Sequence, residues 1–224
     1  HTCAKLIEFI DTDYAAQIND DDILISGNIV RSIKIMNESE SVSGINGKAL
    51  LLGIKEDNAF GEVTWINHYT LGQLSQKNPY ERVKDFLNNQ KNLNLSIFRS
   101  KYYNEIYKKI SKLSRINSYY DFEEIIHGII MSSNGRIMQK EYLSNIRQGH
   151  KNQLYHSVDI YNWLTDSNWS EANLIIKDLV MNIFNKYSDK TEEENLKEFK
   201  NIFLKRYYKK LEYAYKINNQ QKQN

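Results

Sequence analysis

Residues 23–35 read Ile-Leu-Ile-Ser-Gly-Asn-Ile-Val-Arg-Ser-Ile-Lys-Ile, and this stretch decides the fold that the sequence predicts. Isoleucines occupy five odd-numbered positions, while serine, asparagine and lysine fill even-numbered ones. Such alternation with β-branched residues is typical of a half-buried β-strand. Gly27 stands on the apolar side, which indicates a bend or a close approach of another backbone. A long strand that bends can serve both sheets of a small closed barrel, so we expect the first barrel strand here.

Two apolar runs further along the chain predict a β-hairpin. Residues 48–54 are largely apolar on both sides, as in a central strand, and residues 61–66 alternate around Val63 and Trp65. Turn-forming residues at 56–61 separate the two runs. We therefore expect the second and third strands at these positions.

Helical spacing replaces strand spacing after residue 70. Pro79 suits the first turn of a helix, where its missing N–H has no cost. Two sets of apolar residues recur three to four positions apart: Val83, Phe86 and Leu87, then Ile106, Ile110 and Leu113. The spacing predicts a helical insertion at about 70–118.

A second hairpin is predicted from residues 122–131 and 136–143. Asn134-Gly135 lies between these runs, and this dipeptide tolerates the positive φ of a tight hairpin turn. The two runs would supply the fourth and fifth strands. The sequence thus predicts an α+β chain whose core is a five-stranded barrel of the OB type, with the helical insertion between strands 3 and 4.

Helical patterns fill the rest of the chain. An apolar stripe predicts one helix from about residue 152, and residues 169–187 form a second amphipathic pattern. Thr191 and Glu194 have the spacing of a capping box, which predicts a last helix from 192 to about 217. We expect an OB domain over 1–164 and a helical C-terminal extension over 165–224. The stripe consists of Leu154, Val158, Tyr161 and Leu164.

The composition limits the function classes. Thirty Lys and Arg against 28 Asp and Glu give a net charge of +2, so a polyanion would have to meet a local basic patch. The single cysteine, Cys3, excludes an intramolecular disulfide and any multi-cysteine zinc site, which suits the cytosol or nucleus. No apolar run approaches the roughly 18 residues of a membrane span, and we expect no membrane contact.

The order of these elements resembles the middle OB subunit of replication protein A and the related Stn subunit of the CST telomere complex. The resemblance covers about residues 5–164 and is carried by loose motifs. It departs from the family in its long insertion and in the missing second aromatic platform, where Ile130, Met131 and Met138 stand instead. The matching positions are the strand glycines Gly27 and Gly128, the turn ends Asp57 and Gly61, Trp65, and His156 at the C-terminal helix.

The resemblance implies that Trp65 stacks on DNA bases and that the C-terminal helix enters a three-helix bundle with partner subunits. Basic and aromatic residues on other segments could follow a phosphate backbone. The alternatives are a tryptophan packed at a strand end, a solvated helix face, and an apolar stripe that only plugs the barrel. The candidate nucleic-acid-binding residues are Trp65, Tyr69, Lys101, Tyr103, Lys108 and Arg136, and the candidate partner-binding residues are Leu154, Val158, Tyr161 and Leu164.

An enzyme is not expected. Glu124 and His127 have the i, i+3 spacing of one di-iron pair, but the second pair and the further glutamates are absent. His127 followed by Asn134-Gly135-Arg136 resembles the Fic signature of AMP-transferring enzymes. The spacing is one residue too long, however, and the acidic residue and first glycine are missing. We expect no cofactor and no metal.

The sequence therefore predicts a non-enzymatic OB-fold subunit of a single-stranded DNA-binding complex, either replication protein A-like or telomeric. It would act mainly in assembly, with weak DNA contact of its own. The expected partners are a small and a large OB-fold subunit, bound through the C-terminal helix, and single-stranded DNA, G-rich if the role is telomeric. The expected location is nuclear and chromosomal. The alternatives are a protein-interaction module without a nucleic-acid role and a nucleotidyl-transferring enzyme.

Overall fold

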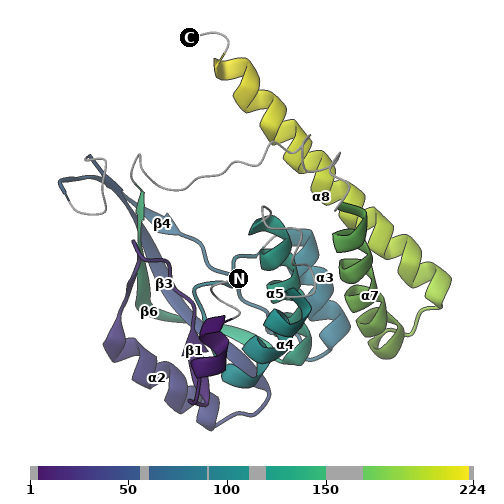
Figure 1. Ribbon diagram of the computed structural model, residues 1–224, viewed down its shortest axis with the longest axis horizontal. Coiled ribbons are helices and arrows are strands. Elements are labelled where there is room, and N and C mark those ends of the chain that lie inside the picture. The colour runs from purple at the N-terminus through teal and green to yellow at the C-terminus, as the bar shows by residue number, and fades with distance from the viewer. Residues whose placement is uncertain (1–4, 56–60, 90, 111–119, 150–168, 222–224) are drawn as a thin grey trace.

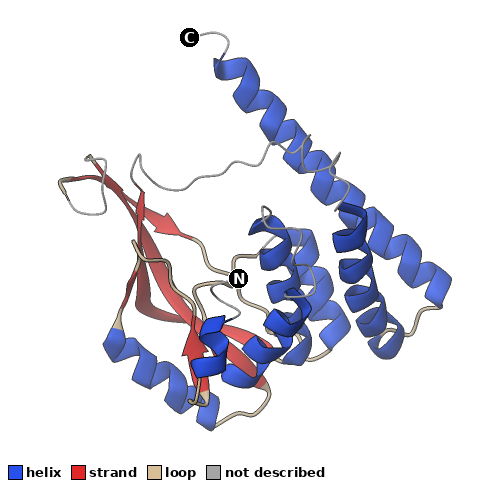
Figure 2. Cartoon of the chain, in the orientation of Figure 1, coloured by secondary structure: helices blue, strands red, loops and turns tan. Residues whose placement is uncertain are grey.

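A computed structural model of the chain describes residues 5–55, 61–89, 91–110, 120–149 and 169–221. A curled β-sheet lies beside a group of helices, and two further helices extend that group away from the sheet (Figure 1). Figure 2 shows the strands gathered in one layer and the helices around it. The predicted α+β class is confirmed.

Six strands form the sheet in the order β1-β5-β3-β6-β2, and β4 pairs with β3 beside this path. β3 and β6 run parallel, whereas the other pairs are antiparallel. The five-strand count of the prediction is not confirmed. The strands are β1 (Tyr14–Ala16), β2 (Ile23–Leu24), β3 (Val42–Ile54), β4 (Val63–Tyr69), β5 (Ile97–Arg99) and β6 (Arg136–Gly149).

β3 is the strand on which the sheet is built. Along one edge it pairs first with β5 at Gly44 and Ile45, then with β4 from Ala49 to Ile54, and along the other edge it pairs with β6. Register shifts interrupt the β3–β6 ladder near Gly44 and Lys48, and such bulges bend a strand. The predicted hairpin of the second and third strands is confirmed as β3 and β4.

The prediction of a strand over 23–35 is wrong beyond Leu24, because the chain forms helix α2 (Ser26–Asn37) there. The same residues satisfy helical spacing: Ile29, Ile35 and Met36 pack together on one side of α2. Among the even-numbered polar residues, Ser26 and Lys34 are exposed, but Ser32 is not. Ser32 is buried, and its hydroxyl bonds to that of Tyr142 on β6. The pattern of residues 23–35 fits both the strand period and the helix period, and the chain forms a helix from Ser26.

The predicted second hairpin is also wrong, because residues 122–131 belong to helix α5 (Tyr120–Asn134). Residues 125–132 are all buried, and a helix that is enclosed on every side needs no polar face. Gly135 then ends the helix, and β6 starts at the next residue, parallel to β3. A Cβ on Gly135 would press on the backbone of Ser43, so the Asn-Gly pair marks a tight helix-to-strand junction.

The predicted insertion contains helices α3 (Pro79–Asn89) and α4 (Ser100–Ile110), but strand β5 lies between them. The insertion is therefore part of the sheet as well as of the helical layer. α3 packs on α5, and α4 packs on α5 and β5. The helices cover the face of the sheet opposite to α2, since Gly44 lies against Phe98 in the helical core while Ile45 lies against Met36 of α2.

Helices α7 (Trp169–Tyr187) and α8 (Glu192–Gln221) confirm the two predicted C-terminal helices. The capping box is confirmed too: the backbone N–H of Thr191 donates to Glu194, and the backbone N–H of Glu194 donates to the Thr191 hydroxyl. α7 packs on α3 and α5, and α8 packs on α3 and α7. The helical extension therefore shares one apolar core with the insertion, through side chains such as Phe184 and Phe199.

A buried arginine connects α3 to the end of α5. Arg82 is 4% exposed and donates to the carbonyl oxygens of Ser132 and Ser133, as well as to those of Gln76 and Lys77. The last carbonyls of a helix lack partners within the helix, and a cation there is favoured by the helix dipole. Arg82 thus fixes the point where α5 passes into β6.

The candidate partner-binding helix with Leu154, Val158, Tyr161 and Leu164 lies outside the described residues. Among the helices that the structure describes, none is long and apolar enough to cross a membrane.

We predict that Gly128→Ala destabilises the protein although alanine favours helices. A Cβ at Gly128 would overlap the ring of Phe86 on α3. Overpacking costs about 1–3 kcal/mol, against a gain in helix propensity of about 1 kcal/mol. Urea unfolding measures the net loss. A Phe86→Leu change should be less harmful in the Gly128→Ala background than alone.

Gly27→Ala in α2 is the matched control, because nothing lies within 4 Å of a Cβ at that position. It should leave the free energy of unfolding unchanged or raise it by up to about 1 kcal/mol. Equal destabilisation by both alanines would contradict the close packing of α5 on α3.

Candidate nucleic-acid interface

Trp65 lies near the start of β4, and its indole covers Gly53 of the neighbouring strand. It pairs with Gly53 on β3, which in turn pairs with Gly149 on β6. A Cβ on Gly53 would overlap indole atoms Cε2 and Nε1, and the Cζ2 and Cη2 atoms lie 3.9 Å from the Cβ position of Gly149. Two glycines in adjacent strands therefore make room for one indole ring.

The outer side of this indole faces solvent. Trp65 is 44% exposed although its inner side rests on the backbone of β3. The surrounding β4 residues 63–68 are exposed as well. An aromatic ring held on one side and free on the other can accept a second flat ring by stacking.

Arg147 lies on the same face of the sheet as Gly149, two residues before it on β6. Its guanidinium lies 4.8 Å from the centre of the Tyr69 ring and donates to the Tyr69 hydroxyl at 2.7 Å. Nε lies 3.3 Å from the Asp22 carboxylate. Burial alone would lower the pKa of Arg147, but Tyr69 and Asp22 hold that pKa above its usual value. Arg147 is therefore a fixed cation, ion-paired with Asp22, two residues before Gly149 on β6.

Tyr69 positions Arg147, and other side chains in turn fix the position of Tyr69. Its hydroxyl accepts from the Asn92 side chain, and its ring packs on the cluster of Ala49, Leu71 and Leu95. Asn67 lies between Trp65 and Tyr69 on the exposed side of β4. The structure thus brings the predicted residues Trp65 and Tyr69 together on one surface, with different roles. We call Trp65, Asn67, Tyr69 and Arg147 the tryptophan face.

The other predicted residues lie elsewhere. Arg136 begins β6, thirteen positions before Gly149, which corresponds to roughly 40 Å of extended strand, and it donates to the Ser41 hydroxyl. Lys101 and Lys108 are exposed on α4, which packs on β5, α5 and the 3-10 helix η1 (Ile7–Phe9). These three residues do not form one surface with Trp65.

The predicted contact of Tyr103 with nucleic acid is wrong. The residue is 3% exposed, and its ring lies 6.2 Å from Phe98 and 5.8 Å from His127 in the helical core. Burial raises the pKa of its hydroxyl. Tyr103 belongs to the apolar side of α4, together with Ile106, and a base cannot reach it.

His127 is a core residue of α5. Its Nδ1 lies 3.0 Å from the Asn94 side-chain oxygen, and the Asn94 amide donates to Glu124. Burial lowers the pKa of His127 to about 4, so the ring is neutral at physiological pH. No group of three or more metal-ligating side chains occurs among the residues that the structure describes.

Sequence reasoning missed Gly53, Gly149 and Arg147. Glycine within a strand pattern signals close approach of another group, and this signal was available at Gly53. It did not say which side chain approaches, because that depends on the register of three strands. The chain matches no protein-family model, and no curated protein matches it.

We predict that Gly53→Ala displaces the Trp65 indole, because the new methyl group would occupy the space of the ring. The indole N–H signal of Trp65 in a two-dimensional NMR spectrum, assigned with Trp65→Phe, should shift or broaden. Gly149→Ala is the matched control, since its Cβ would meet ordinary contacts at 3.6 Å and beyond. An unchanged Trp65 signal in Gly53→Ala would contradict the flat placement of the ring.

We also predict that His127 makes the protein less stable in acid. The folded pKa of about 4 lies below the ordinary value of 6.5, so protonation favours the unfolded chain. The stability is fully present above pH 6.5 and falls as the pH drops towards 4, by up to about 3 kcal/mol. Urea unfolding from pH 4 to 7 measures this. His127→Gln should flatten the profile in that window, whereas the exposed His68→Gln should retain it.

Proposed function

We propose that the chain is a non-enzymatic subunit that binds single-stranded nucleic acid on the tryptophan face. The observation that carries the proposal is the Trp65 indole, seated over Gly53 with its outer side exposed. Ordering a free tryptophan for stacking costs side-chain entropy, and here the sheet has already ordered it.

Stacking on Trp65 favours single strands over duplexes. In a duplex the base faces are covered by neighbouring bases, whereas an unpaired base can place its ring on an aromatic side chain. Arg147 supplies a guanidinium on the same face, although Asp22 already pairs with its charge, and Asn67 supplies an amide that can hydrogen-bond to bases or sugars. These groups are suited to one or two nucleotides.

Affinity for nucleic acid is expected to be weak. The net charge is only +2, and the tryptophan face offers one arginine, so few counterions are released on binding. Weak contact by one subunit becomes useful when several subunits hold the same strand, because linked sites raise the effective concentration. This reasoning supports a role within a larger assembly.

The relation to replication protein A-like or telomeric complexes is part of the proposal. Its support is the curled sheet, which is compatible with an OB-like fold, and an exposed tryptophan on the strand where the family has its stacking residue. The proposal includes a nuclear location, partner OB subunits, and assembly through the helix that the sequence predicts around Leu154 and Val158. Co-purified partners should be lost on Val158→Asp.

A second candidate is a protein-interaction module without a nucleic-acid role. The observation that favours it is β4, which pairs with β3 along one edge and with no other described strand. Ile66 on the opposite face is 61% exposed, and Val63 is 45% exposed. An open, apolar strand edge can accept a strand from a partner. Salt-dependent oligonucleotide binding separates the two candidates.

We predict that Trp65→Ala weakens binding of the full chain to a labelled single-stranded oligothymidylate by about tenfold or more, since stacking contributes about 1–3 kcal/mol per base. Fluorescence anisotropy at low salt measures the affinity. Trp65→Phe should retain part of it. Ile66→Ala removes an exposed apolar side chain from the opposite face of the same strand and should have no effect. Loss of binding in Ile66→Ala but not in Trp65→Ala would refute the tryptophan face as the site.

A further inference from the structure

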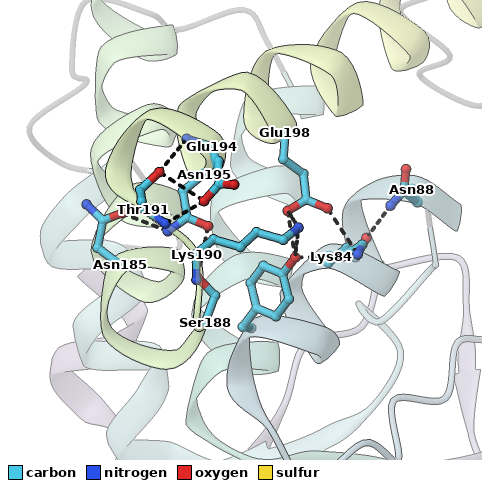
Figure 3. A network of polar contacts seen from close by, with 10 residues as sticks. Lys84, Asn88, Asn185, Ser188, Lys190, Thr191, Glu194, Asn195 and Glu198 are labelled. Carbon is cyan, nitrogen blue, oxygen red and sulfur yellow. Dashed lines mark hydrogen bonds and ion pairs between the residues drawn. The ribbon is translucent and has the colours of Figure 1, made fainter.

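A second surface of interest lies between α3 and α8, away from the sheet. A groove of about 450 Å³ is bordered there by Asn88 of α3 and by one side of α8. Figure 3 shows the polar contacts at its rim, where Glu198 reaches between Lys84 and Lys190. We call it the α3–α8 groove. Its other lining residues are Glu194, Lys197, Asn201, Ile202 and Lys205.

Both glutamates of the groove are already engaged. Glu194 accepts from the backbone N–H and the hydroxyl of Thr191 in the capping box. Glu198 lies 3.0 Å from the Lys84 ammonium and 2.7 Å from that of Lys190, and it accepts from the hydroxyl of Tyr80. Despite partial burial these partners lower the pKa of Glu198 to about 2, so the carboxylate is ionised at physiological pH.

The positive charge of the groove exceeds the negative charge. Lys190, Lys197 and Lys205 line it with Lys84 directly behind, and only Glu194 and Glu198 oppose them, which leaves two positive charges. Lys197 and Lys205 are exposed and have no ion-pair partner among the described residues. The uncompensated charge therefore sits on these two lysines.

Lys197, Asn201 and Lys205 follow one another at intervals of four residues along α8. Four residues correspond to about 6 Å of helix, so the three side chains span about 12 Å on one side of it. An ammonium, an amide and a second ammonium thus follow one side of the helix, and the buried Ile202 adds an apolar side chain to the same lining. A compact anion would meet only part of this line, whereas a linear one can meet all of it.

We propose that the α3–α8 groove binds the phosphate groups of a linear polyanion. Each phosphate of such a chain carries charge and several acceptor oxygens, so one phosphate can accept from a lysine and from the Asn201 amide together. Lysine binds phosphate as a point charge and makes no demand on base or sequence. The chemistry fits both inorganic polyphosphate and the phosphodiester backbone of a single strand. The groove is independent of the tryptophan face.

The test measures binding of the full chain to two probes, fluorescent inorganic polyphosphate and labelled oligothymidylate, over a range of salt. The combined change Lys197→Gln and Lys205→Gln should weaken polyphosphate binding about tenfold. It should also lower the slope of log affinity against log salt by about 1.4, since each contact to a flexible strand contributes about 0.7. Trp65→Ala should leave polyphosphate binding unchanged.

The combined change Lys34→Gln and Lys200→Gln is the matched control. It removes the same charge from exposed positions that do not line the groove, one on α2 and one on α8. The control should bind polyphosphate within about twofold of the wild-type chain, as expected for charges outside the contact. Equal loss in both combined variants would mean attraction by overall charge and would overturn the proposal.

The two probes distinguish the source of the phosphates. If the groove variant weakens both probes, the groove takes a phosphodiester backbone, and if it weakens polyphosphate alone, the ligand is inorganic polyphosphate. Unchanged binding of both probes would overturn the proposal. The proposal would also be overturned if polyglutamate bound as tightly as polyphosphate and the groove variant lost this binding, because the groove would then bind acidic peptides. None of these results depends on Trp65, whose variant tests the proposed function separately.

Discussion

The parallel pairing of β3 with β6 is the constraint on which the rest of the structure depends. A parallel pair cannot be closed by a tight turn and needs a crossover connection. The residues between the two strands supply it, with β4 and β5 added to the edge of β3 and with α3, α4 and α5 laid over one face. Arg82 and Gly135 fix the last step, where α5 turns directly into β6.

The same pairing creates the tryptophan face. Because β3 and β6 pair without a further register shift from Ala49 to Gly53, Gly53 and Gly149 come side by side, and β4 adds Trp65 on the other edge of β3. Helical side chains cover Phe98, whereas Trp65 is 44% exposed. A stacking ring is thus held on rigid strands and needs no loop to position it, which lowers the entropy cost of binding.

The sequence predicted the parts whose pattern allows one period only. β4, α7, α8 and the capping box at Thr191 follow that rule, and the apolar run of β3 was assigned as a strand together with the turn formers that follow it. The sequence-based prediction failed at α2 and α5, where isoleucine-rich segments fit both the strand period and the helix period. Their β-branched residues favour strands locally, but burial of these segments against the sheet and among the helices overrode this preference. Trp65 was found as a candidate from its residue type and from the resemblance, but Gly53 and Arg147 required the strand register, which a single sequence does not carry.

The two proposed surfaces lie in different parts of the molecule and are suited to different chemical groups, bases in one case and phosphates in the other. The tryptophan face has an aromatic ring and one arginine that is already bonded to Tyr69 and Asp22, so it suits base contact more than charge neutralisation. The α3–α8 groove has lysines without described partners and no exposed aromatic ring along its lining, so it suits phosphates alone. A chain with a net charge of +2 can bind a polyanion only where positive charge is concentrated locally. Among the described residues, the α3–α8 groove has more positively charged side chains than the tryptophan face.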